Sequence, residues 1–153
     1  MRSIVEGAEL EILLVEDSPT DAELALLAIR DNGYLGRVVH LDDGAKAVDF
    51  LLGIGAFANR RGAPPPRVVF LDVKLPGMGG IEVLRRVKGH ASLCAIPIVM
   101  LTSSQELSDV ADCYRLGVNS YVVKPIDFDA YRAMMADLLT YWTRRNHPPP
   151  VSA

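Results

Sequence analysis

The sequence predicts a three-layer α/β sandwich, in which helices cover both faces of a five-stranded parallel sheet. Short apolar runs alternate five times with amphipathic segments along the 153 residues, and this alternation is typical of parallel sheets. The central run, residues 68–71, is apolar throughout and not at every second position, which indicates a strand that is buried on both faces. We therefore expect one domain over residues 9–145, after an N-terminal extension at 1–8.

Five apolar runs predict the strands of the sheet. They are residues 10–15, 37–41, 68–71, 96–101 and 120–123. For five strand–helix units the natural strand order is 2-1-3-4-5, as in flavodoxin-like folds. In that order the first, third, fourth and fifth strands are neighbours.

Capping residues predict where the helices begin. Ser18 can cap the first helix, with Pro19 in its first position and Asp21 near its positive end, and Gly33 marks its end. Asp43 opens the second helix. The other three helices are expected over residues 80–88, around 110–116 and over 127–144.

Two segments interrupt this alternation. Residues 53–66 are rich in Gly, Pro and Arg, and we expect a loop insert there, either a plain surface loop or part of a partner surface. Its end, residues 63–66, should be extended and exposed, because proline cannot donate hydrogen bonds to a sheet. Residues 146–153 contain three consecutive prolines and are expected to form a flexible tail.

Composition and charge argue against several classes of function. The formal net charge of −3 disfavours non-specific electrostatic binding to nucleic acid or to an anionic membrane. No apolar run approaches the roughly 18 residues that span a bilayer, and no signal core is visible, so we expect a cytoplasmic protein. Cys94 and Cys113 should be reduced thiols in or near the core, and the three histidines lack metal-ligand spacing.

Polar residues follow four of the predicted strands at the point where each ends. After the first, third, fourth and fifth strands these are, respectively, Glu16 with Asp17, Asp72, Thr102 and Lys124. Because the carboxyl ends of parallel strands meet at one edge of a sheet, we expect these side chains to share a pocket. Three carboxylates this close repel one another, and a bound Mg²⁺ would relieve the repulsion.

The same residues suit phosphoryl transfer. Lys124 offers a positive point charge for a phosphate oxygen, and Thr102 offers a hydroxyl donor. Asp72 lies in the middle of the set and can act as the nucleophile, which gives an aspartyl phosphate. Each residue taken alone has an ordinary alternative as a cap, a turn residue or a surface charge, but that explanation requires a coincidence at four separate strand ends.

Four segments together resemble the receiver domain of two-component response regulators. They are ILLVEDSPTDAEL, VVFLDVKLPGMGGIEVL, PIVMLTSS and GVNSYVVKPID, in the family's order and spacing. The resemblance covers about residues 10–142 and implies a CheY-like fold. It also implies a protein that catalyses its own phosphorylation and dephosphorylation, and not an enzyme with a separate substrate.

The resemblance implies a phosphoacceptor and a metal site. Asp72 would accept a phosphoryl group from the phosphohistidine of a sensor histidine kinase. Mg²⁺ would be bound directly by Asp17, Asp72 and the backbone carbonyl of Lys74, and through water by Glu16.

The resemblance also implies a conformational switch. Thr102 would be the switch hydroxyl, and Tyr121 the aromatic that turns inward with it, although an edge-strand aromatic often just covers the sheet. Lys124 would pair with the acceptor and the phosphate, and the Lys124–Pro125 peptide bond would be cis. The first helix and the turn at Pro125–Ile126 would dock the kinase.

The chain is similar to stand-alone receivers that partner phytochrome-type kinases, in the insert and in the end YWTRRNHPPP. It has no room for an output domain, so signalling through protein contacts in a phosphorelay is expected. The subgroup implies a homodimer through the fourth and fifth helices and the fifth strand. Tyr141 and Trp142 would extend that surface, unless one of the two rings belongs to the core.

Three other functions are open to this fold. A haloacid-dehalogenase-like phosphatase needs a second aspartate two residues after the first, where this chain has Lys74. A flavodoxin needs a phosphate-binding loop after the first strand, where Glu16 and Asp17 would repel a phosphate. A degenerate receiver that serves only as a docking or dimerisation module would not need the complete set of site residues.

Overall fold

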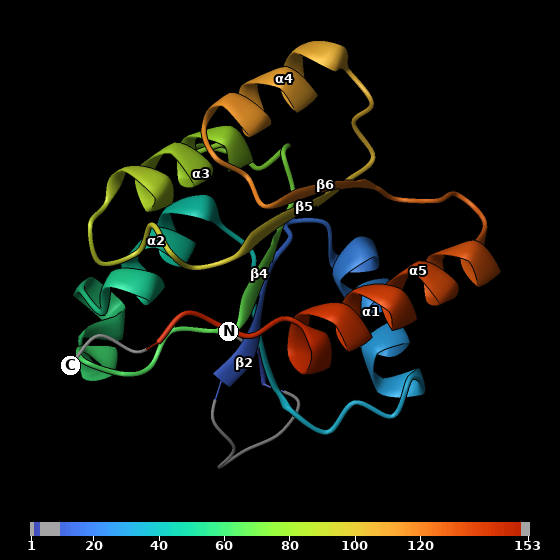
Figure 1. Cartoon of the computed structure of the whole chain (residues 1–153), viewed down its shortest axis with the longest axis horizontal. Helices are drawn as coiled ribbons and strands as arrows, with labels where there is room; N and C mark the ends of the chain where they lie inside the picture. The colour runs from blue at the N-terminus through green and yellow to red at the C-terminus, as the bar shows by residue number, and fades with distance from the viewer. Residues whose placement is uncertain (1, 4–9, 151–153) are drawn as a thin grey trace.

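The computed structural model describes residues 2–3 and 10–150 and contains one six-stranded sheet (Figure 1). Its five parallel strands are, in spatial order, β3 (Arg37–Leu41), β2 (Leu10–Val15), β4 (Val68–Leu71), β5 (Ile98–Thr102) and β6 (Ser120–Val123). The predicted fold class and strand order are confirmed. β5 begins two residues later than predicted, and Pro97 just before it has no N–H to donate to the ladder.

A sixth strand, β1 (Arg2–Ser3), was not predicted. It pairs antiparallel with β3, with Arg2 opposite His40 and Ser3 opposite Val39. Two residues are too few to show a periodicity, so no sequence pattern indicates this strand. It pairs with backbone groups that β3 would otherwise present as a sheet edge.

Helices cover both faces of the sheet (Figure 1). One face carries α1 (Pro19–Asp31) and α5 (Phe128–Thr140), and the other carries α2 (Gly44–Leu52), α3 (Gly80–Gly89) and α4 (Leu107–Arg115). Alternate residues of the strands enter the two cores: Leu71 packs on the α2–α4 side, and Phe70 packs on the other. The continuous apolar run of β4 therefore did indicate burial on both faces. Among the described residues, none of the helices combines the length and apolar character needed to span a bilayer.

The predicted caps are in place, and the last helix ends earlier than expected. Ser18 Oγ accepts from the Asp21 N–H at 3.3 Å, and the Asp43 carboxylate accepts from the Lys46 N–H at 2.9 Å. After α5, a π-helical turn, η2 (Tyr141–Arg145), continues the chain. Its Trp142 is buried in the core beneath α1 and α5, whereas Tyr141 is half exposed. The core role therefore belongs to Trp142.

The insert is more ordered than a plain loop. It contains a 3₁₀-helix, η1 (Gly55–Arg60), which packs on α2. The rings of Phe57 and Phe50 meet edge to face with centroids 5.2 Å apart, and the Arg60 guanidinium lies 3.9 Å from the centre of the Phe50 ring. Contacts with α2 thus hold part of the predicted insert, although this segment has no periodicity of its own. Its alternative role as part of a partner surface stays a prediction. Residues 63–65 are exposed as predicted, but Pro66 is buried.

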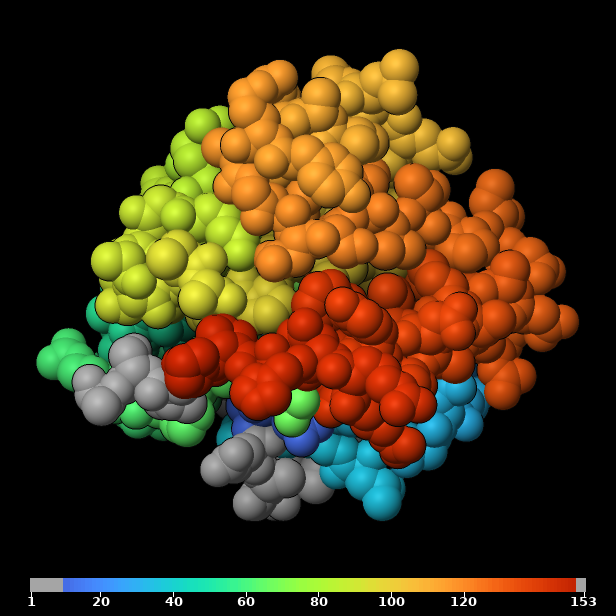
Figure 2. Space-filling model, viewed as in Figure 1, coloured from blue at the N-terminus to red at the C-terminus, as the bar shows by residue number. Residues whose placement is uncertain are grey.

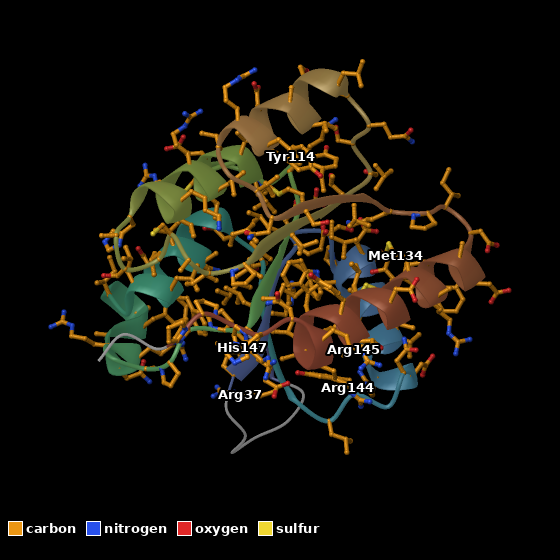
Figure 3. The ribbon with its side chains drawn as sticks, viewed as in Figure 1. Arg37, Tyr114, Met134, Arg144, Arg145 and His147 are labelled. Atoms are coloured by element: carbon orange, nitrogen blue, oxygen red, sulfur yellow. The ribbon has the colours of Figure 1, made fainter. Side chains whose placement is uncertain are left out.

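Residues 146–150 form no helix or strand, as expected, yet they lie against the protein. Arg67 Nη2 donates to the Asn146 carbonyl at 3.3 Å, and Pro149 and Pro150 line a groove beside the end of the insert. Figure 2 shows this C-terminal segment, in red, running across the surface toward the green insert. Several basic side chains lie at this end of the molecule, among them Arg37, Arg144, Arg145 and His147 (Figure 3).

Both cysteines are free thiols, but only one is in the core. Cys113 on α4 is fully buried, and burial raises its pKa to about 11. Cys94 is exposed in the connection before β5, so the prediction of a core position was wrong for this residue. An apolar environment was inferred from residue type alone, and a connecting turn does not provide one.

Gly80, the first residue of α3, allows the helix to approach the end of β4. A Cβ atom there would overlap the carbonyl oxygen of Asp72, and the Gly80 N–H donates to the Val73 carbonyl at 2.8 Å. We predict that Gly80→Ala lowers the free energy of unfolding by about 2–3 kcal/mol, because a backbone contact cannot rotate away. Urea denaturation measures this loss.

Gly89→Ala is the matched control. Gly89 ends the same helix, and a Cβ atom there would meet nothing within 4 Å. Its replacement should change stability by less than about 1 kcal/mol, in the stabilising direction. Equal losses in the two variants would contradict the proposed close approach.

Candidate functional site

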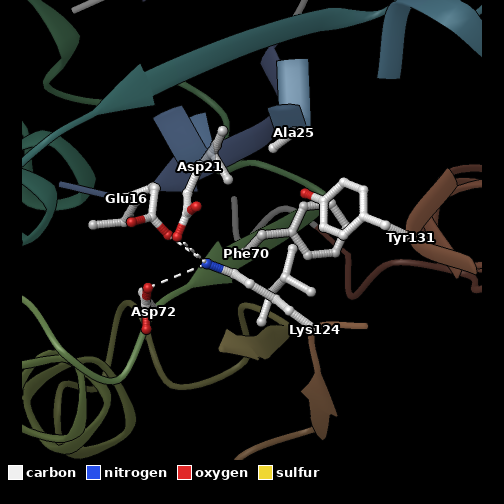
Figure 4. Close-up of a pocket in the computed structure, with 10 residues that line it drawn as sticks. Glu16, Asp21, Ala25, Phe70, Asp72, Lys124 and Tyr131 are labelled. Atoms are coloured by element: carbon white, nitrogen blue, oxygen red, sulfur yellow. Dashed lines mark hydrogen bonds and ion pairs between the residues drawn. The ribbon is translucent and has the colours of Figure 1, made fainter. Parts of the chain in front are cut away.

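The predicted strand ends meet at one edge of the sheet, around the ammonium group of Lys124 (Figure 4). Lys124 Nζ lies 2.8 Å from Glu16 Oε2, 3.3 Å from Asp72 Oδ2 and 3.3 Å from Asp21 Oδ2. An ammonium group has three N–H donors, so each carboxylate can accept one. The contacts with Glu16 and Asp21 join residues 108 and 103 positions apart in the sequence, and the contact with Asp72 joins residues 52 apart.

Glu16 is held by both its backbone and its side chain. Its N–H donates to the Leu41 carbonyl at 3.0 Å, and its own carbonyl accepts from His40 Nε2 at 2.8 Å. Its Oε1 accepts from the Ser18 N–H at 3.1 Å. β3 and the start of α1 thus fix this carboxylate, which is almost fully buried.

Asp72 is fixed in a similar way at the end of β4. Its N–H donates to the Val15 carbonyl at 3.1 Å, which continues the ladder with β2. Its Oδ1 accepts from the Lys74 N–H at 3.2 Å, so the loop after the strand turns back on the carboxylate. The Lys74 side chain itself is exposed.

Thr102 and Tyr121 are connected through Ser104. Thr102 Oγ1 accepts from the Ser104 N–H at 3.2 Å, and the Tyr121 hydroxyl donates to the Ser104 carbonyl at 2.9 Å. Ser104 Oγ in turn donates to Asp109 Oδ2 on α4 at 2.7 Å. The loop that follows β5 therefore links both predicted switch residues to the first turn of α4.

The sequence reasoning missed the position of Asp21 at this site. It predicted Asp21 only as a charge near the positive end of α1, whereas the structure brings its carboxylate to Lys124. Carboxylate oxygens of Glu16, Asp21 and Asp72 all lie within 4.8 Å of one another. Asp17 is exposed and is not part of this group, so its role as a direct metal ligand stays a prediction.

Burial and neighbouring charges set the protonation of the site. Burial, reinforced by a hydrogen bond shared with Asp72, raises the pKa of Glu16 to about 7 despite the proximity of Lys124. Burial also acts to raise the pKa of Asp72, but the hydrogen bond with Glu16 and the charge of Lys124 outweigh it and lower that pKa. The three carboxylates raise the pKa of Lys124 above its ordinary value, against the effect of burial. The Asp72 carboxylate is therefore ionised at neutral pH.

The donor set fits a hard divalent cation. Three carboxylates from two strand ends and one helix supply only oxygen ligands, which Mg²⁺ and Mn²⁺ prefer. One ammonium group offsets their charge only in part. A divalent cation at this edge would neutralise the remainder, and a transferred phosphoryl group would add negative charge that needs the same neutralisation.

The peptide bond between Lys124 and Pro125 is trans, like every other peptide bond of the described residues. The prediction of a cis bond was wrong for this structure. The two isomers of a bond before proline differ by only about 0.5–1 kcal/mol. Local packing therefore decides between them, and the sequence does not reveal that packing.

The chain matches the family model of the response regulator receiver domain over residues 12–136. The chain belongs to this family. The matched region contains every residue of the site described above, from Glu16 to Lys124.

Named relatives agree with this assignment. Response regulator Rcp1 of Synechocystis sp. is 34% identical over 131 residues, which cover 86% of this chain and 87% of Rcp1. The solved structure of the Mn²⁺-bound form of Rcp1 has a TM-score of 0.83 and 33% identity, and the match covers 92% of this chain and 99% of that one.

Two further solved structures carry names that refer to phytochromes. The phosphorylated cyanobacterial phytochrome response regulator RcpA matches with a TM-score of 0.85 and 31% identity, over 94% of this chain and 100% of that one. The bacteriophytochrome response regulator RtBRR is 47% identical with a TM-score of 0.73, over 94% of this chain and 86% of that one. The chain is thus a receiver domain that resembles phytochrome response regulators.

Glu16 should make the metal-free protein less stable as the pH rises. Its pKa is 4.5 without the fold and about 7 within it, so between these values the folded state holds a proton that the unfolded state has lost. The stabilisation is complete below pH 4.5 and is lost as the pH rises through about 7. Its size is on the order of 1–3 kcal/mol. Asp72, whose pKa is lowered from 3.8, acts only at more acidic pH.

Urea denaturation between pH 5 and pH 8, with a chelator present, measures this dependence. Glu16→Gln should flatten the curve. Glu82→Gln, at an exposed glutamate of α3, should leave it unchanged. A wild-type slope that persists in Glu16→Gln would assign the effect to another group.

Proposed function

We propose that this receiver accepts a phosphoryl group on Asp72 from the phosphohistidine of a sensor histidine kinase, in a Mg²⁺-dependent reaction in the cytoplasm. One observation carries the proposal. The buried Asp72 carboxylate has a lowered pKa and lies 3.3 Å from the Lys124 ammonium. An ionised, desolvated carboxylate beside a fixed cation is suited to attack phosphorus.

Phosphoryl transfer needs one bond to form and one to break. An oxygen of Asp72 attacks in line, the bond between phosphorus and the imidazole nitrogen breaks, and the leaving electron pair returns to that nitrogen. Lys124 pairs with a phosphoryl oxygen. The Thr102 hydroxyl can donate to another, because it already shares a hydrogen bond with the Asp72 carboxylate and can turn from it to the phosphoryl group.

The metal would neutralise the charge that gathers on the phosphoryl oxygens. We propose Asp17, Asp72 and the carbonyl of Lys74 as its direct ligands and Glu16 as a ligand through water. The buried acidic group at this edge supports a divalent site. Asp17 is exposed and directly follows Glu16, which is compatible with a ligand that closes on the cation when it binds.

The loop at Ser104 would transmit the effect of phosphorylation from Thr102 to α4. When Thr102 turns toward the phosphoryl group, it gives up its bond to the Ser104 N–H. The contacts of Ser104 with Tyr121 and Asp109 must then adjust, which shifts α4 and the surface formed by α4, β6 and α5. The phosphoryl group biases this equilibrium only by its different contacts with the two states.

We propose a phytochrome-type kinase as the phosphodonor, on the basis of the names of RcpA and RtBRR. A cavity of about 230 Å³ opens next to the site, between α1 and the turn that follows β6. Leu24, Pro125 and Ile126 line it, and Ile126 is fully exposed. An apolar rim around the acceptor site suits the docking of a helical phosphodonor domain.

The homodimer also stays a proposal. The α4–β6–α5 surface exposes Tyr114, Val123 and Phe128, and Tyr141 lies just beyond α5. Figure 3 shows Tyr114 on α4. An exposed apolar patch of this kind often marks a protein contact. Sedimentation equilibrium with and without phosphorylation would decide whether the chain pairs.

We predict a phosphoryl adduct that depends on both Asp72 and Mg²⁺. Intact mass spectrometry after incubation with acetyl phosphate should show one added phosphoryl group in the wild type and none in Asp72→Asn. Omission of Mg²⁺ should reduce the adduct at least tenfold, because the single Lys124 ammonium cannot offset the charge of the phosphoryl group and of the carboxylates together. Asp31→Asn, which removes an exposed carboxylate of α1, should be phosphorylated like the wild type.

An unchanged adduct in Asp72→Asn would disprove the assignment of the acceptor. A folded wild-type protein with no adduct, and no binding of beryllofluoride at Asp72, would instead favour a degenerate receiver that acts only as a docking module.

A further inference from the structure

We propose that Asp21 is a positioning residue that holds the Lys124 ammonium on the α1 side of the site and competes with the phosphoryl group for it. This inference rests on the proposed phosphorylation of Asp72. It concerns a residue for which the sequence suggested only a helix-end role, and it assigns Asp21 a part in the balance between the two states of the receiver.

The ammonium of Lys124 is already saturated. Its three N–H donors face three carboxylates, at 2.8 Å from Glu16 and 3.3 Å from both Asp21 and Asp72. The Lys124 side chain is only 12% exposed, so water offers few additional partners. Lys124 can therefore bond to a phosphoryl oxygen only if one of the three present contacts is given up.

Asp21 is the partner whose loss costs least. The Glu16 contact is the shortest of the three, and the Glu16 side chain is only 4% exposed. Asp72 keeps one carbonyl oxygen after it is phosphorylated on the other, so it can still accept from the ammonium. Asp21 is 45% exposed, and water can replace the ammonium at its carboxylate. Phosphorylation should therefore exchange Asp21 for a phosphoryl oxygen.

Because of this exchange, Asp21 disfavours the phosphorylated state. The Asp21–Lys124 ion pair stabilises the unphosphorylated state, and this stabilisation is lost on phosphorylation. Removal of the Asp21 charge should therefore favour the phosphorylated form, or its analogue with beryllofluoride on Asp72. Partly exposed ion pairs of this kind correspond to an affinity change of about 2- to 5-fold.

The test compares Asp21→Asn with the wild type and with Asp31→Asn. Asp31 lies on the same helix and has only a loose contact with Arg132, at 3.9 Å, so its variant matches the charge change away from the site. Beryllofluoride is titrated at saturating Mg²⁺ and followed by ¹⁹F NMR. We expect about 2- to 5-fold tighter binding for Asp21→Asn, and wild-type binding for Asp31→Asn.

A second readout separates positioning from a merely structural role. The side-chain ¹⁵N resonance of Lys124, assigned by its loss in Lys124→Arg, reports the partners of the ammonium directly. It should shift in Asp21→Asn before beryllofluoride is added and stay unchanged in Asp31→Asn. Once beryllofluoride is bound, Asp21→Asn and the wild type should give similar Lys124 resonances, because the Asp21 contact is then broken in both.

Three results would overturn the proposal. Beryllofluoride affinity that is equal to or weaker than that of the wild type would show that Asp21 is no competitor. Weaker Mg²⁺ binding by Asp21→Asn, with unchanged beryllofluoride affinity at saturating Mg²⁺, would make Asp21 a metal ligand instead. A wild-type protein that binds no beryllofluoride and forms no adduct on Asp72 would remove the proposed function as well. If the wild type binds beryllofluoride tightly and Asp21→Asn binds it equally well, this inference alone is wrong and the proposed function stands.

Discussion

The ion pairs of the Lys124 ammonium with three carboxylates hold the site of this receiver together. Without Lys124, the carboxylates of Glu16, Asp21 and Asp72 would repel one another within 4.8 Å. With it, Asp72 stays ionised although it is buried, whereas burial raises the pKa of Glu16 despite the proximity of Lys124. The Lys124 ammonium is also the positive charge with which a phosphoryl group on Asp72 would pair. The site without a phosphoryl group thus already holds this cation in place.

The sheet places these groups through backbone bonds and not through the side chains alone. Glu16, Asp72 and Lys124 each donate an N–H to the neighbouring strand, at Leu41, Val15 and Thr102 respectively. Because each functional residue is the first one past its strand, the register of the ladder sets its position. Gly80 completes this arrangement by letting α3 start directly against the Asp72 carbonyl. Stability and function therefore depend on the same few strand ends.

The sequence predicted the residues that follow strands better than those placed by helix packing. Asp72 and Lys124 directly follow continuous apolar runs, so their edge of the sheet was evident from the sequence. Asp21 reaches Lys124 only because of how α1 is rotated against the sheet, which no local pattern encodes. Similarly, η1 depends on the contact between Phe57 and Phe50. The roles of Asp17 and Tyr121 stay predictions, because they concern states with a bound cation or phosphoryl group.

A crystal structure of the complex with Mg²⁺ and beryllofluoride would test the central claim most directly. The account predicts beryllium on an oxygen of Asp72, with Lys124 Nζ bonded to one fluoride and no longer to Asp21, and with the Thr102 hydroxyl bonded to another fluoride. Beryllium on a different carboxylate, or a Lys124 ammonium that keeps all three of its present partners, would contradict the account.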